Sequence, residues 1–188
     1  DKERLKTHTR LDMNFLCALI NDIEKHGEIK IKLKYFPNSS IYKVGNKLRY
    51  IEFGFKNAKR VHKIISVDDS DHLNAILRTA ESGCRIEELK EAIVSDDVSA
   101  DDAEGFLNEI ISAQLLVSEL HPVVTGGDLL DRLIIKLEKI HPDFSLLPIL
   151  KDIQSGINFI NKSDAGLDVS YYQKIISLVE KTGSKHDP

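Results

Sequence analysis

Histidine, cysteine and paired aspartates are the side chains through which this chain could do chemistry. Seven histidines are scattered along it: His8, His26, His62, His72, His121, His141 and His186. No two of them lie four residues apart on a predicted helix, whereas a metal site needs clustered ligands. The paired aspartates at 96–97 and 101–102 are typical of a solvated loop and a helix N-terminus rather than of an acid–base pair. Since no Gly-x-Ser-x-Gly nucleophile elbow occurs either, we expect no catalytic residue, no metal and no cofactor in this chain.

The composition is that of a globular protein. The chain has 188 residues, 41% of them hydrophobic and 30% charged, which is enough for one substantial domain or two small ones. No apolar run is long enough to span a bilayer, and no signal peptide opens the sequence. Cys17 and Cys84 occur singly, as free thiols do. These features predict a cytoplasmic protein, and the missing initiator Met and polar last residues lead us to expect a piece of a longer one.

The net charge of −4 is unevenly distributed along the sequence. Residues 1–63 hold 15 Lys or Arg against 7 Asp or Glu, whereas residues 64–188 hold 11 against 23. Such an asymmetry can steer a charged partner to one end of a protein. The alternative, equally open from the sequence, is that the basic strands only form a solvated face.

A three-stranded meander and three helices are predicted between residues 40 and 120. Strands at 40–44 and 47–55 flank Gly45-Asn46, a two-residue hairpin signal, and a turn at 56–58 leads to a strand at 59–67. Helices follow at 71–82, 86–95 and 100–114, and a short strand at 115–120 closes the segment. This order predicts a winged helix-turn-helix-like module.

The flanking segments are predicted to be mainly helical. A helix at 12–26 precedes a strand at 28–36, in which apolar and basic residues alternate. Beyond the module, helices are expected from 129 to the His141-Pro142 stop, near 145–161 and at 168–182. The expected fold class is therefore α+β, with segments 1–39, 40–120 and 121–188 as scaffold, winged-helix-like module and helical segment.

The third helix of the predicted module is acidic. Residues 99–114 carry four carboxylates and no Lys or Arg. Phosphate would repel such a helix, and phosphate contacts supply most nucleic-acid affinity. A DNA-binding winged-helix regulator stays the rival hypothesis, and a structural domain without a ligand is a further one, but the charge favours a peptide as the partner.

Several ordered motifs resemble those of one enzyme family. Residues 35–52 (YFPNSSIYKVGNKLRYIE) and 115–126 (LLVSELHPVVTG) are similar to stretches of the N-terminal region of lantibiotic dehydratases. Shorter matches join them in the same order: Arg10 to Met13, Ile76-Leu77 through Gly83, Glu87-Glu88-Leu89 and Phe106-Leu107. The resemblance runs over about residues 8–140 and identifies the chain as a fragment of that region.

This resemblance implies an activity and a partner. Family members transfer glutamate from glutamyl-tRNA to Ser and Thr of a precursor peptide and then eliminate it to leave dehydroamino acids. Their N-terminal half contains a winged-helix-like element that binds the precursor's leader peptide as an added strand, a mode called β-augmentation. The family's Arg-rich Thr-Pro-Phe-Gly segment would precede Asp1 and its elimination region lies far downstream, so we expect no catalysis by this fragment alone.

The resemblance places the expected sites on particular residues. The docking edge would be the strand at 59–67, and the residues expected near the peptide are Arg60, Val61, His62, Ile64 and Ile65, with Asn108, Ile111 and Leu115 across a groove. A second expected surface would hold glutamyl-tRNA or support glutamylation, and its candidates are Arg10, Asp12, Lys30, Lys32 and Lys34. For Arg10 and Asp12 the alternative is a solvated cation and a helix cap. The sequence does not indicate the precursor or the oligomeric state.

Overall fold

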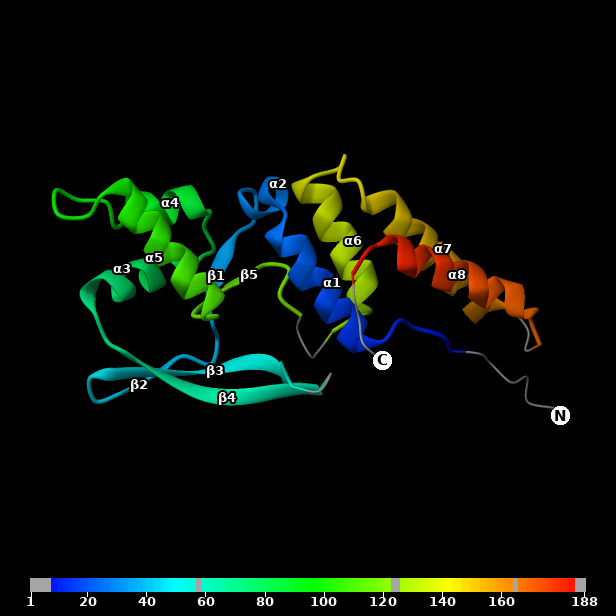
Figure 1. Cartoon of the computed structure of the whole chain (residues 1–188), viewed down its shortest axis with the longest axis horizontal. Coiled ribbons are helices and arrows are strands. Elements are labelled where there is room, and N and C mark those ends of the chain that lie inside the picture. The colour runs from blue at the N-terminus through cyan, green and yellow to red at the C-terminus, as the bar shows by residue number, and fades with distance from the viewer. Residues whose placement is uncertain (1–7, 57–58, 123–125, 164–165, 185–188) are drawn as a thin grey trace. The chain divides into compact units, whose positions relative to one another are not determined.

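The chain folds as two units, each with its own apolar core, in a computed structural model (Figure 1). The structure describes residues 8–56, 59–122, 126–163 and 166–184, and the side chains of residues 55, 56, 59 and 60 lie outside that description. Unit 1 comprises Asp1–Lys25 and Pro122–Pro188, and unit 2 comprises His26–His121. Residues 26–39 therefore belong with the predicted module, while the three-segment organisation expected from the sequence stays a prediction.

Unit 1 consists of four helices in its described part: α1 (Met13–Lys25), α6 (Leu129–Ile140), α7 (Leu147–Lys162) and α8 (Val169–Lys181). Their sequences place apolar residues at helical spacing, and in α6 the stripe at Leu130, Leu133 and Leu137 is buried. Asp128 caps α6 by accepting from the backbone N–H of Leu130 at 2.9 Å. The four helices predicted from periodicity are confirmed within a few residues at their ends.

Unit 2 contains a three-stranded antiparallel sheet in the order β2–β3–β4: β2 (Tyr42–Val44), β3 (Lys47–Lys56) and β4 (Lys59–Asp68). The hairpin turns at Gly45, whose φ of +60° suits glycine, and the two strands pair from Val44↔Lys47 onward. β3 and β4 pair over ten positions, from Lys47↔Asp68 to Lys56↔Lys59. The predicted meander is confirmed, and of the turn predicted at 56–58, residues 57 and 58 lie outside the described residues.

Three helices follow the sheet: α3 (Asp71–Ala80), α4 (Ile86–Glu91) and α5 (Ala100–Ser112). Figure 1 shows them gathered on one side of the β2–β3–β4 sheet. Ser70 and Ser99 cap α3 and α5 through their hydroxyl oxygens. The mixed α+β class is therefore confirmed, with the predicted meander and helices, while the winged-helix assignment stays a prediction.

The strand predicted at 28–36 is wrong over most of its length. The structure has a one-turn helix α2 (Gly27–Lys30), a turn, and a short strand β1 (Tyr35–Pro37). Ile29 and Leu33 are fully buried and four residues apart, joined by a hydrogen bond from Leu33 N to Ile29 O, whereas Ile31 is 53% exposed. The apolar pattern fits a helical turn as well as a strand, and the helical turn is the one that buries both Ile29 and Leu33.

The strand predicted at 115–120 is β5 (Leu116–Ser118), and it pairs with β1 rather than with the meander. The register runs from Tyr35↔Ser118 to Pro37↔Leu116. An isolated bridge between Tyr35 and Cys84 joins β1 to the loop after α3. These contacts join β1 to β5 and to the loop after α3.

Asp69, just after β4, predicts an acid-sensitive contact in unit 2. Hydrogen bonds from the Lys43 ammonium and from the Asn74 amide hold the pKa of this carboxyl below its ordinary value of 3.8. Because the folded pKa is the lower one, the stabilisation is present above pH 3.8 and is lost as the pH falls through the folded pKa. When the free energy of unfolding is measured in urea between about pH 5 and about pH 2, it should fall less steeply with falling pH in Asp69→Asn than in the wild type. Asp97→Asn, at an exposed aspartate, is the control and should show the pH dependence of the wild type. An equal pH dependence in wild type and Asp69→Asn would contradict the prediction.

Candidate peptide-docking edge

β4 forms one edge of the sheet. It pairs with β3 along its whole length, and within the described residues no strand pairs with its other side. An open edge presents backbone N–H and C=O groups that an added strand can satisfy. Ten residues of β4 therefore offer a site for β-augmentation.

The register shows which backbone groups of β4 point outward. The N–H and C=O groups of Ile51 and Phe53 bond to side chains on the side of β3 away from β4. In an antiparallel pair the N–H and C=O of one residue point to the same side of its strand. Two residues directly opposite each other either both point toward the partner strand or both point away from it. The residues opposite Ile51 and Phe53 are Ile64 and His62, so their backbone groups face the open edge.

A contact at the end of β4 supports the same alternation. The N–H of Asp69 donates to the Asn46 carbonyl at 3.1 Å, so odd-numbered residues of β4 bond inward, to β3. By the same alternation Ser66 joins His62 and Ile64 on the open edge. These three residues define what we call the open edge of β4.

The predicted docking side chains of β4 divide between the two faces of the sheet. Ile65 lies opposite the buried Tyr50 and is half-buried, as is Val61 on the same face. Ile64 is 68% exposed and lies beside Ile51, which is 44% exposed, on the other face. For Arg60 the backbone belongs to β4, but its side chain lies outside the described residues. A strand added at the edge would meet both sets, because its own side chains alternate between faces.

The predicted helix-side residues differ in exposure. Asn108 is half-buried, and its amide oxygen accepts from the Lys30 ammonium at 2.8 Å. Ile111 is half-buried, whereas Leu115 is 3% exposed and packs in the core beyond the end of α5. A groove that these three residues share with β4 stays a prediction.

The residues predicted for a tRNA or glutamylation surface do not share a strand face. Lys30 ends α2, and Lys32 and Lys34 lie in the turn before β1, with Lys34 exposed. Arg10 is exposed, while Asp12 accepts from the backbone N–H of Asn14 at 2.8 Å and so caps α1. The capping alternative for Asp12 is thus realised, and a role for any of these residues toward tRNA stays a prediction.

Three polar residues at the sheet were missed from the sequence: Asn38, Ser40 and Gln114. Their side chains form the hydrogen bonds to Ile51 and Phe53 described above. Residues 37–40 carry a turn signal, but nothing in the local pattern points to partners 61 residues apart, as for Gln114 and Phe53. Only the tertiary structure brings them together.

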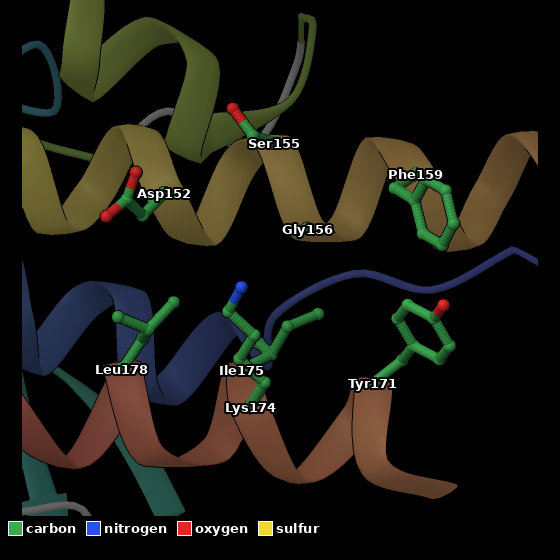
Figure 2. A pocket seen from close by; sticks show the side chains of 8 residues that line it. All are labelled: Asp152, Ser155, Gly156, Phe159, Tyr171, Lys174, Ile175 and Leu178. Atoms are coloured by element: carbon green, nitrogen blue, oxygen red, sulfur yellow. The ribbon is translucent and has the colours of Figure 1, made fainter. Parts of the chain in front are cut away.

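A cavity of about 340 Å³ lies between α7 and α8 in unit 1 (Figure 2). At one end the rings of Phe159 and Tyr171 stack with their centroids 5.2 Å apart, and Asp152 lies toward the other end. Gly156 lets α8 approach closely, since a Cβ there would lie 3.1 Å from Ile175 Cγ1. The lining is mainly apolar, and its few polar groups do not converge on one point.

The described part of the chain contains neither a cluster of metal ligands nor a helix suited to span a membrane. No group of three or more His, Cys, Asp or Glu residues there is arranged to hold a metal ion. None of the helices described is both long enough and apolar enough to cross a membrane.

Comparisons with known proteins show the family of the chain and a solved structure of similar fold. The family model described as "Lantibiotic dehydratase, N terminus" matches residues 1–188. The crystal structure of the tRNA-dependent lantibiotic dehydratase MibB from Microbispora sp. 107891 is similar in fold, with a TM-score of 0.74 at 16% sequence identity. That match covers 97% of this chain and 18% of the MibB chain, so the chain spans less than a fifth of the length of that relative. No curated protein sequence matches the chain.

Proposed function

The chain belongs to the lantibiotic dehydratase family, and on that premise we propose that it binds the leader segment of a precursor peptide at the open edge of β4. The whole dehydratase would glutamylate Ser and Thr of that precursor with glutamyl-tRNA and eliminate the glutamate. The fragment supplies recognition and scaffolding, and the chemistry belongs to the rest of the enzyme. Its place of action is the cytoplasm, where charged tRNA is available.

The open edge of β4 is the observation that carries this proposal. Main-chain hydrogen bonds to His62, Ile64 and Ser66 would give affinity without demanding a particular peptide sequence. The side chains on either face would give selectivity, with the exposed Ile64 contacting an apolar leader residue. Lys63 is exposed as well and suits an acidic leader residue.

The charge of α5 supports a peptide over DNA. Asp101, Asp102 and Glu109 are exposed along it, and Glu104 is exposed in an ion pair with Lys90 at 2.7 Å. The helix offers phosphate no cation of its own, so it is unsuited to the major groove. The family's tRNA dependence calls for a basic surface elsewhere, and for it we propose Lys32 and Lys34.

A fluorescence-polarisation titration tests the proposal directly. The probe is a labelled synthetic leader peptide from the precursor gene that neighbours the gene for this chain, and duplex DNA and glutamate tRNA are titrated in parallel. Saturable micromolar or tighter binding of the leader, with none of DNA, is the expected result. Binding of DNA alone would replace the proposal by a DNA-binding regulator. Any tRNA binding should weaken as salt rises, since phosphate contacts release counterions.

Replacing Ile64 with aspartate should weaken leader binding by about tenfold or more, equivalent to about 1.4 kcal/mol. The substitution places a charge where an apolar leader side chain is expected, and that charge loses water when the peptide binds. The fold should persist, because Ile64 is 68% exposed. Ile176→Asp is the matched control, an exposed isoleucine of unit 1, and it should bind the leader as the wild type does. Unchanged affinity of a folded Ile64→Asp variant would refute this docking edge.

A further inference from the structure

The free side of β3 is closed by side chains rather than by a strand. β2 ends its pairing at Tyr42↔Arg49, whereas β3 continues to Lys56. Beyond that point the N–H of Ile51 donates to Ser40 Oγ at 2.9 Å, and Asn38 Nδ2 donates to the Ile51 carbonyl at 3.1 Å. Two backbone groups that β2 would have satisfied in a longer strand are satisfied by this turn.

Gln114 continues the same pattern one step further along β3. Its Oε1 accepts from the N–H of Phe53 at 3.0 Å, and its Nε2 donates to the Phe53 carbonyl at 2.8 Å. The primary amide thus pairs with Phe53 as a strand residue would. Asn38 connects the two contacts, since its Nδ2 also donates to the backbone carbonyl of Gln114 at 2.8 Å.

The backbone of Gln114 is in a conformation that favours glycine. Its φ is +59°, and it is the only residue other than glycine with a positive φ in the described part of the chain. It follows the C-cap of α5, where Gln114 N bonds to Ile111 O at 3.0 Å and Leu115 N to Ile110 O at 2.9 Å. This is the Schellman arrangement, which usually has glycine at this position. Glycine would relieve the backbone strain, but it would lack the amide that binds Phe53.

We propose that Gln114 is a positioning residue that closes the free side of β3 and thereby leaves β4 as the long edge at which a peptide strand adds. The proposal rests on the proposed function for its peptide, and on the two hydrogen bonds between Gln114 and Phe53 for the closure itself. β2 spans only three residues, so its outer edge offers a far shorter ladder. Gln114 also joins the sheet to the end of α5. The predicted peptide contacts on β4 and those on α5 therefore keep a fixed position relative to each other.

Two substitutions of Gln114 separate this role from a general effect on stability. Gln114→Gly and Gln114→Ala both remove the amide, but only glycine relieves the positive φ, so the glycine variant should be the more stable of the two. Both should raise the exchange rate of the Phe53 amide hydrogen by about tenfold or more, because that N–H loses its acceptor. Both should weaken binding of the labelled leader by about five- to tenfold. If Gln114 acted only through stability, the more stable Gln114→Gly variant would bind the leader more tightly than Gln114→Ala.

The control is a glutamine of unit 1 with a comparable hydrogen bond. Gln154 Nε2 donates to Asp131 Oδ1 at 2.6 Å, and Gln154→Ala should change neither Phe53 exchange nor leader affinity. Retained Phe53 protection together with wild-type affinity in Gln114→Gly would overturn the proposal. If the wild-type chain bound no leader, the proposed function would fail, and Phe53 exchange would still decide whether Gln114 closes β3.

Discussion

Replacing Gly83 with alanine is expected to lower the free energy of unfolding by about 3 kcal/mol. Gly83 has a φ of +78°, and a Cβ at this position would lie 2.3 Å from Cζ of Phe36. The left-handed backbone costs an L-residue about 1–2 kcal/mol, and the overpacked ring adds about 1–3 kcal/mol. The thermal midpoint should fall by roughly 6–12 °C for a chain of this size.

Gly105→Ala is the control within the same unit. Gly105 lies inside α5 with no atom within 4 Å of its virtual Cβ, so alanine there should stabilise the helix by about 1 kcal/mol at most. A double-mutant cycle with Gly83→Ala, Phe36→Ala and the variant that carries both measures how much of the loss comes from the ring rather than from φ. If Gly83→Ala unfolds at the wild-type midpoint in differential scanning calorimetry, both the left-handed backbone of Gly83 and the close approach of Phe36 are contradicted.

The elements that the sequence predicts well are those whose signals are local. The stripe of leucines in α6 with Asp128 before it, and Gly45-Asn46 between two apolar runs, each fit one structure only. Ile29 and Leu33 fit two structures, because a spacing of four residues falls on one face of a strand and also on one turn of a helix. Burial in unit 2 decided between them, and no local pattern contains that information.

The candidate site divides in the same way. The resemblance implies that the strand at 59–67 is the docking edge. Within the described residues β4 pairs with β3 on one side and with no strand on the other, and peptide docking there stays a prediction. Which side of β3 is closed depends on Asn38 and Gln114, whose contacts join residues 76 positions apart. Gly83 is a similar case. The sequence predicts the end of the helix at 71–82 just before it, but not the close approach of the Phe36 ring. Long-range side-chain contacts therefore account for most of what sequence reasoning missed.

A proline at position 62 is expected to abolish most leader binding while leaving the sheet intact. His62 lies opposite Phe53, whose backbone bonds away from β4, so the N–H of His62 points to the open edge. Proline has no N–H, and it is tolerated on edge strands where that group faces outward. The leader would lose one main-chain hydrogen bond and meet the pyrrolidine ring, which should weaken binding by about tenfold or more.

Two neighbouring variants give this experiment its specificity. His62→Ala keeps the N–H and removes only one exposed side chain from the edge, so it should bind the leader within about threefold of wild type, a smaller loss than in His62→Pro. Lys63→Pro removes an N–H that points inward, because Lys63 lies opposite Glu52 in the alternate set, and it should cost about 3 kcal/mol of stability. Circular dichroism melting and the polarisation titration, run on all three variants, therefore separate loss of leader binding at the open edge from loss of the hydrogen bonds between β3 and β4. A folded His62→Pro variant with wild-type affinity would show that the leader does not add to β4, because no strand can pair with that edge and be indifferent to the loss of its N–H.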